Sequence, residues 1–321
     1  MTAQEALGLG LQGSIMLTVL GFGLGATFAE ANYLFHQPAL LLRCVLSMNV
    51  VMPLIVIAAT RALDLPFEIR VALVAISISP VPPILQKNQL GAGGRIEFVT
   101  GLLVAMSALA IVLVPLWVWI IDRVFSHHGE LYPLAVAQVM LTTVFLPLTI
   151  GLLIRRFVPA AQRASAPVMT IAGAMLAIVA VLLIWGLREQ VLALIGNGLI
   201  LLIVAIVVVG LIVGHLLGGP VDGDRTALAM ATASRHPAVA LAVATSGAAV
   251  GAKPELGIIL LYLVVATVVS IPYRKCRHRG LAKATRRTRP TLGAGRRRDR
   301  RAILFTNPVD APLKALAQSM S

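Results

Sequence analysis

The sequence predicts an all-α polytopic membrane protein with about nine transmembrane helices. Hydrophobic residues make up 58% of the 321 residues, and charged residues only 12%. The mean hydropathy of +0.91 is far above that of soluble domains. Apolar stretches of about 20 residues recur along the chain, and this is the length that crosses a bilayer as a helix. The composition therefore excludes a soluble globular protein.

Nine apolar stretches are long enough to span a membrane, and the connections between them are too short for a separate soluble domain. In chain order the predicted spans are 14–28, 40–60, 70–87, 98–121, 132–154, 167–187, 192–217, 226–250 and 256–273. Residues 1–273 are thus predicted to form the transmembrane domain. In the first span, Gly21, Gly23 and Gly25 form a stripe of small residues that favours close packing against neighbouring helices.

The third span is interrupted by prolines near its centre. Pro80, Pro82 and Pro83 fall within four residues of an otherwise apolar stretch. Proline removes a backbone donor and clashes with the preceding turn, so a single proline would kink the helix. Three prolines so close together predict that the helix opens. Non-helical backbone at this depth must be buried in protein or line a cavity.

The eighth span carries a second interruption, at Arg235, His236 and Pro237. An arginine at the centre of a bilayer costs at least about 2.5 kcal/mol, so it rarely persists there without a partner or a role. Paired broken helices in corresponding halves of a chain indicate the binding site of a transporter. His236 is predicted either to relay a proton or to be a neutral histidine whose ring is satisfied by a freed backbone carbonyl.

The net charge of +14 belongs to the end of the chain. From position 274 onward there are fourteen Lys and Arg residues against two Asp residues. Residues 274–321 are predicted to form a basic, disordered cytoplasmic tail that contacts anionic lipid head groups; a nucleic-acid partner is not expected. A shifted reading frame is an alternative origin of this composition. With a cytoplasmic tail, nine spans leave the N-terminus outside, in a bacterial inner (plasma) membrane.

Six motifs, in order and spacing, resemble the bile acid:sodium symporter (BASS) family. They are VLGFGLGATF, NVVMP, DLPFEI, SPVPPILQK, FLPLTIGLLIRR and TALAMATASRHPAVALAVA. The resemblance covers about residues 14–273 and suggests a divergent bacterial-type member. It implies an inverted repeat of five-helix halves, in which the fourth helix of each half is broken and crosses its counterpart. The first helix of the first repeat is missing here. Spans 1, 5 and 6 would form a panel, and spans 2–4 and 7–9 a core.

The chain departs from the sodium-coupled members of this family at the second crossing helix. These members carry a Glu-x-Gly-x-Gln-Asn motif whose Glu and Gln ligate sodium. The matching positions here are Ala231, Ala233, Arg235 and His236. The carboxylate is absent and a guanidinium repels a nearby cation, so sodium coupling is not expected. Arg235, together with Lys87, is expected to occupy electrostatically the place of the bound ion.

The predicted function is secondary transport of a small organic anion by alternating access. The spans carry no Asp or Glu away from their ends, so an organic cation would find no counter-charge there, whereas a neutral amphiphile remains open. The candidate substrate-binding residues are Arg235, His236, Lys87, Gln86, Asn49, Ser234 and Thr232, and the candidate crossover backbone is Pro80, Pro82, Pro83 and Pro237. No cofactor or metal is predicted.

Three other functions compete with this prediction. An efflux carrier of similar fold, of the auxin or arsenite kind, is the main alternative. A membrane sensor is less favoured, because no loop is large enough for an output domain. An intramembrane enzyme is not expected, because the spans hold no metal-ligand spacing, no nucleophile with a base and no paired carboxylates.

Overall fold

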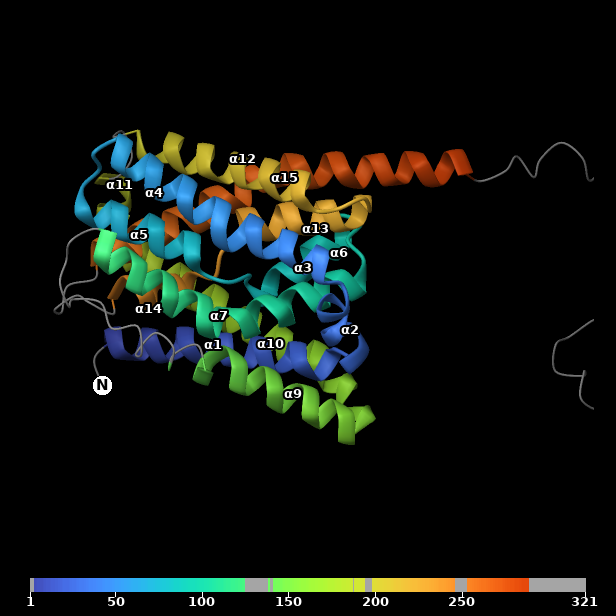
Figure 1. Cartoon of the computed structure of the whole chain (residues 1–321). Coiled ribbons are helices and arrows are strands. Elements are labelled where there is room, and N and C mark those ends of the chain that lie inside the picture. The colour runs from blue at the N-terminus through green and yellow to red at the C-terminus, as the bar shows by residue number, and fades with distance from the viewer. Residues whose placement is uncertain are drawn as a thin grey trace, which may run out of the picture. The chain divides into compact units, whose positions relative to one another are not determined.

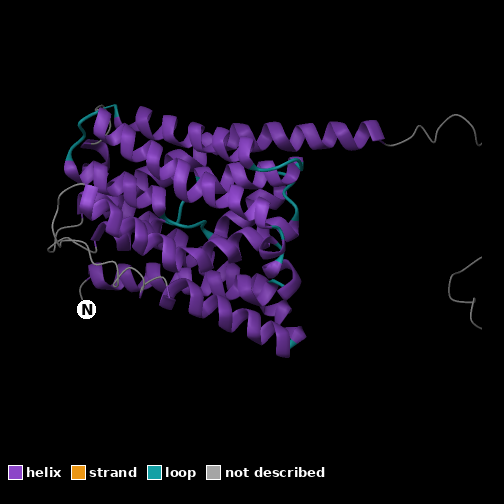
Figure 2. Cartoon of the chain, in the orientation of Figure 1, coloured by secondary structure: helices purple, strands orange, loops and turns teal. Residues whose placement is uncertain are grey.

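The computed structural model of the chain describes residues 3–124, 138, 141–186, 188–193, 198–245 and 253–288. Helix is the only regular secondary structure in these residues (Figure 1, Figure 2). The α-helices are α1 (Ala3–Gly25), α2 (Phe28–Asn32), α3 (Pro38–Val45), α4 (Met52–Ala62), α5 (Phe67–Ile78), α6 (Gln86–Gly91), α7 (Ile96–Val124), α9 (Leu146–Phe157), α10 (Gln162–Gly186), α11 (Arg188–Ala193), α12 (Leu199–Leu217), α13 (Asp222–Ala233), α14 (Pro237–Thr245) and α15 (Lys253–Thr288). The shorter turns are the 3-10 helices η1 (Leu34–His36), η3 (Pro83–Leu85) and η5 (Pro159–Ala161) and the π-helices η2 (Leu46–Val51) and η4 (Leu141–Phe145). The predicted all-α polytopic fold class is confirmed.

Six helices of the described chain are long and apolar enough to cross a membrane. They are Gly8–Gly25, Pro38–Ala62, Ile96–Ile121, Pro159–Val179, Leu199–Leu217 and Glu255–Gly280. One further pair of helices, Phe67–Ile78 and Pro83–Gly91, passes the same test together; the two are bent by 62° and would make a seventh crossing if they form one broken span. The predicted fifth and eighth spans lie partly outside the described residues, so the total of nine stays a prediction.

The first helix ends earlier than the sequence suggested, at Gly25 instead of Phe28. Thr27 caps the next helix, α2: its hydroxyl accepts from the N–H of Glu30 at 3.2 Å. The Glu30 carboxylate in turn accepts from the N–H of Thr27 at 2.9 Å. This reciprocal capping box fixes the start of α2 and so ends the preceding helix.

The chain divides into two units, Met1–Arg279 and Gly280–Ser321. Of the second unit, the structure describes only the end of α15, up to Thr288. This helix runs past the predicted boundary at Tyr273 because the Ala, Leu, Arg and Lys residues that follow are strong helix formers. The remainder of the predicted disordered tail lies outside the described residues.

The two interrupted helices are deeply buried. Every residue of α5 from Ala72 to Ile78 is buried, and so is every residue of α13 from Thr226 to Ala233. α5 packs against α14, and α13 packs against α12. Exposed apolar side chains lie on surrounding helices, as with Ile178 on α10 and Leu201 on α12. In a bilayer these helices face the lipid and separate the broken backbone from it.

Close packing joins α1 to α9 and α10 (Figure 1). A Cβ on Gly23 would lie 2.7 Å from the carbonyl oxygen of Leu148 in α9. A Cβ on Gly151 would lie 2.6 Å from the carbonyl oxygen of Leu20 in α1. The other two glycines of the predicted stripe face side chains of α10. The predicted role of this stripe in close helix packing is therefore confirmed.

Replacing Gly151 with alanine should destabilise the contact between α1 and α9. The added methyl group has only backbone to meet, and such overpacking costs roughly 1–3 kcal/mol. We expect Gly151→Ala to lower the melting temperature of the detergent-solubilised protein. Gly173→Ala on α10 is the matched control, because nothing lies within 4 Å of its added Cβ. Equal melting temperatures for the two variants would contradict this packing.

Candidate functional site

The first break follows α5 in the interior of the helix bundle, where Figure 2 shows loop backbone. Ser79 is extended, with ψ 148°, and Pro82 is extended with ψ 131°. Proline cannot donate the backbone bond that would continue a helix. The Ser79 hydroxyl instead donates back to the carbonyl of Ala75 at 2.7 Å. The carbonyls of the break therefore need donors from elsewhere, because the hydrocarbon region offers no water.

The second break lies between α13 and α14, and it meets the first. Ser234 is extended, with φ −112° and ψ 133°, and Pro237 begins α14. The backbone N–H of His236 donates to the carbonyl of Pro80 at 3.0 Å. The two helices thus open where the sequence predicts, and their open segments are hydrogen-bonded to each other at the crossover.

The guanidinium of Arg235 joins this crossover to a third element. It donates through Nη1 to the carbonyl of Ser79 at 3.1 Å and through Nη2 to the carbonyl of Met48 at 2.8 Å. Ser79 belongs to the first break and Met48 to η2. Only 3% of Arg235 is exposed. One side chain from the second break therefore satisfies two backbone carbonyls on different elements.

The π-helical turn η2 is fixed on both sides by polar contacts. The hydroxyls of Ser47 and Thr232 are 2.8 Å apart, which joins η2 to α13. The indole N–H of Trp117 on α7 donates to the carbonyl of Asn49 at 2.7 Å. A π-helix shifts the hydrogen-bond register of the backbone, and such turns occur often at functional sites. Here the turn presents the Met48 carbonyl to Arg235.

The crossover carries the positive charge of Arg235, which no carboxylate of the described residues compensates. In the described part of the chain, the ion pairs involve other arginines, and none includes Arg235. Carbonyl dipoles stabilise the guanidinium, but they add no negative charge. A buried charge without an opposite partner is costly, so an anion would be favoured beside Arg235.

His236 presents an unused polar atom beside this charge. The residue is 3% exposed, and no described residue forms a hydrogen bond with its ring Nδ1. A buried nitrogen without a partner costs free energy. The ring is therefore available to hydrogen-bond a ligand at the crossover.

Three other candidate residues, Asn49, Thr232 and Ser234, lie at or beside the crossover. Gln86 and Lys87 have their contacts elsewhere. Asn49 and Thr232 are buried around η2, and the amide nitrogen of Asn49 lies 3.5 Å from the sulfur of Met106. Ser234 is half-buried on the second break. Gln86 instead donates to the hydroxyl of Thr100 at 3.2 Å.

Lys87 is exposed, and it lines a separate surface groove formed by α6 and α15. The four candidate crossover prolines lie in or beside the two breaks: Pro80, Pro82, Pro83 and Pro237.

Sequence reasoning missed the residues that accept from Arg235 and the tyrosine that supports the second break. The Tyr262 hydroxyl, from α15, donates to the carbonyl of Ala233 at 3.1 Å and is buried. A tyrosine at mid-span was the available signal, since its hydroxyl needs a partner at that depth. For Met48 the available signal was Pro53, which lies five residues later and has no N–H to donate to the Met48 carbonyl in a π-helix.

An ion pair anchors the start of α13. Arg95 donates to both carboxylate oxygens of Asp224, at 2.9 Å and 2.7 Å, and to the hydroxyl of Tyr33 at 2.7 Å. Asp224 is buried, and its hydrogen bond raises the pKa of the Arg95 guanidinium above its ordinary value. This bidentate ion pair links α13 to the segment that precedes α7.

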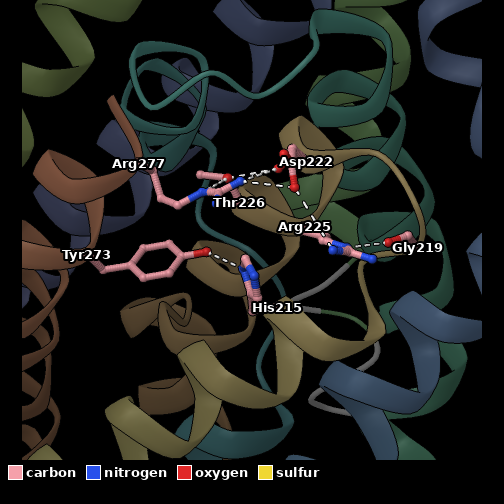
Figure 3. A network of polar contacts seen from close by, with 7 residues as sticks. All are labelled: His215, Gly219, Asp222, Arg225, Thr226, Tyr273 and Arg277. Carbon is pink, nitrogen blue, oxygen red and sulfur yellow. Dashed lines mark hydrogen bonds and ion pairs between the residues drawn. The ribbon is translucent and has the colours of Figure 1, made fainter. Parts of the chain in front are cut away.

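A second polar network joins α15 to the same end of α13 (Figure 3). Arg277 donates to the hydroxyl of Thr226 at 2.8 Å and pairs with Asp222 at 3.5 Å. His215 Nδ1 and the Tyr273 hydroxyl are 2.9 Å apart, which joins α12 to α15. The half-helix that leads into the second break is thus held at its other end by charged contacts.

Comparison with known proteins identifies the family of the chain. The model of the sodium bile acid symporter family matches residues 14–213. No curated protein matches the chain. The family match covers more than half of the chain and includes the first break, η2 and most of the surrounding helices. The chain therefore belongs to the sodium bile acid symporter family.

Proposed function

We propose that this transporter moves an organic anion by alternating access through the crossover of its two broken helices, without sodium coupling. Membership of the family makes the chain a secondary transporter of the bile acid or organic anion type. The substrate site, the coupling and the mechanism are the proposal. The observation that carries it is the buried guanidinium of Arg235, which has carbonyl partners from two elements and no carboxylate partner among the described residues.

The charge of Arg235 supports an anionic substrate. A carboxylate beside it would gain a charge-assisted hydrogen bond and would neutralise a buried cation. His236 would add a neutral donor or acceptor through Nδ1. Thr232, Ser234 and Asn49 would contribute smaller polar contacts around the crossover. A cationic substrate would meet only repulsion there.

The same charge argues against sodium at the crossover. Sodium is bound by oxygen ligands, and carboxylates add the charge that favours it. By resemblance, Ala231 matches the sodium-binding glutamate of the sodium-coupled members; it is fully buried and its side chain offers no ligand. Two carbonyls at the crossover already accept from the guanidinium. Arg235 therefore acts as a fixed cation where the sodium-coupled relatives carry a mobile one.

Alternating access requires two bodies that move against each other. We assign α1, α9 and α10 to one body, the panel, because α1 packs against both other helices through small residues. The core would contain the broken helices with α3, α4, α7, α12 and α15. The hydrogen bonds that Arg235 and His236 make within the crossover would keep the core rigid as it moves.

The protein is an integral membrane protein, and we assign it to a bacterial inner membrane with its C-terminus in the cytoplasm. The support is the charge distribution: basic residues are concentrated from Arg274 onward, directly after the last apolar stretch. Such segments stay on the cytoplasmic side. With nine spans, the N-terminus would lie outside.

Transport should not require sodium. In proteoliposomes, replacing sodium chloride with choline chloride should leave the initial rate of uptake nearly unchanged, because the cation at the crossover is covalently part of the chain. Bile acids, short keto and hydroxy acids, and pantothenate are the substrates to screen. A steep and saturable dependence on sodium would contradict the proposal.

Changing Arg235 should weaken both anion binding and folding. Removing one partner of a buried ion costs roughly 2–5 kcal/mol, so Arg235→Gln should reduce anion affinity by at least about 30-fold. Arg235→Lys keeps the charge but loses the planar fork that reaches two carbonyls, so its affinity should lie between the two. Isothermal titration of the anion that best stabilises the wild-type protein measures the affinities, and the melting temperature of each variant without ligand measures the effect on folding.

Arg95→Gln is the matched control for this comparison. It removes the ion pair with Asp224, which holds the opposite end of the same half-helix, α13. We expect it to lower the melting temperature and to leave anion affinity within about twofold of the wild type. If Arg235→Gln also lowers the melting temperature and leaves the anion affinity within about twofold, Arg235 only stabilises the fold and the proposal is wrong.

A further inference from the structure

A groove with a strongly basic lining lies between α6 and residues 274–279 of α15. The described residues that line it are Lys87, Asn88, Gly91, Arg274, Lys275, His278 and Arg279. Four of them carry a fixed positive charge, His278 adds an imidazole, and none is a carboxylate. In the described part of the chain, none of the four charged residues forms an ion pair. Such a concentration of like charge attracts an anion.

The position of the groove on α15 indicates what kind of anion it binds. Val264 and Val268 are exposed by 46% and 58% on the apolar part of this helix. At 100° per residue, Lys275 and Arg279 lie on the same helical face as these valines, two to four turns further along. An apolar stripe that ends in basic side chains matches a lipid, with acyl chains beside the stripe and a phosphate at its end.

The opposite face of α15 packs against the rest of the protein. Arg277 pairs with Asp222 and donates to Thr226, as Figure 3 shows. This contact fixes the rotation of α15 about its axis. Lys275 and Arg279 therefore lie on the side of α15 that faces away from α13. The groove therefore presents its charges outward from a helix whose orientation is fixed.

We propose that this groove binds the phosphate head group of an anionic phospholipid. The acyl chains would lie along Val264 and Val268, and Lys275, Arg279 and Lys87 would contact the head group. Because Lys87 lies on α6, which follows the first break, a bound lipid would bridge that half-helix and α15. This site is distinct from the crossover and does not depend on what the transporter carries.

The test is a titration of the full-length protein in detergent with phosphatidylglycerol, with bound lipid counted by native mass spectrometry. Each basic residue near a membrane surface contributes about fivefold to lipid affinity. Lys275→Gln combined with Arg279→Gln should therefore weaken binding about 30-fold, and Lys87→Gln about fivefold. Phosphatidylcholine should bind much more weakly than phosphatidylglycerol to the wild type.

Arg156→Gln combined with Arg163→Gln is the matched control, because it removes the same charge from two exposed positions outside the groove. It should leave phosphatidylglycerol binding within about twofold of the wild type. Equal losses in both double variants would overturn the proposal, because they would indicate non-specific attraction. Displacement of the lipid by millimolar inorganic phosphate would also overturn it, in favour of a site for a soluble anion.

Discussion

The structure depends on how the backbone carbonyls freed by two broken helices are satisfied inside a bilayer. The prolines and Ser79 open the first helix, and the lost backbone donors must be replaced from within the protein because the hydrocarbon core of a bilayer supplies none. Arg235 supplies one of the missing hydrogen bonds, to Ser79, and the His236 N–H supplies a second, to Pro80. Arg235 also donates to the carbonyl of Met48 in η2. These contacts bring the first break, the second break and η2 together at one point. The remaining helices are arranged around that point.

The hydrogen bonds at the crossover require α13 to keep its position, and contacts at both of its ends hold it there. α13 is held at its start by Asp224 with Arg95, and at its end by the hydroxyl of Tyr262. The contact between α1 and α9 depends instead on glycines that allow the two backbones to approach closely. A hydroxyl adds to the packing of α1 on α10, because Ser165 donates to the carbonyl of Gly21 at 2.6 Å. Directional hydrogen bonds therefore hold the core at the crossover, and close packing of small residues holds the panel together.

Much of the fold could be predicted from the sequence, because its signals are strong and local. Three clustered prolines predict the first break, and a mid-span arginine before a proline predicts the second. The contacts of Arg235 could not be predicted, because its acceptors are backbone carbonyls distant in the chain. Pro53 follows the π-helical turn at Met48, but a single proline predicts only a kink, so the turn itself could not be predicted. Lys87 was grouped with Arg235 by charge, but the bend after the first break carries it to the surface groove.

The central claim is that the guanidinium of Arg235 takes the place of a bound cation at the crossover. Its most direct test is the melting temperature of the wild-type protein in sodium chloride and in choline chloride, each with and without a stabilising organic anion. Sodium alone should not change the melting temperature, and the anion should raise it equally in both salts. Stabilisation by sodium alone, or by the anion only when sodium is present, would contradict the account.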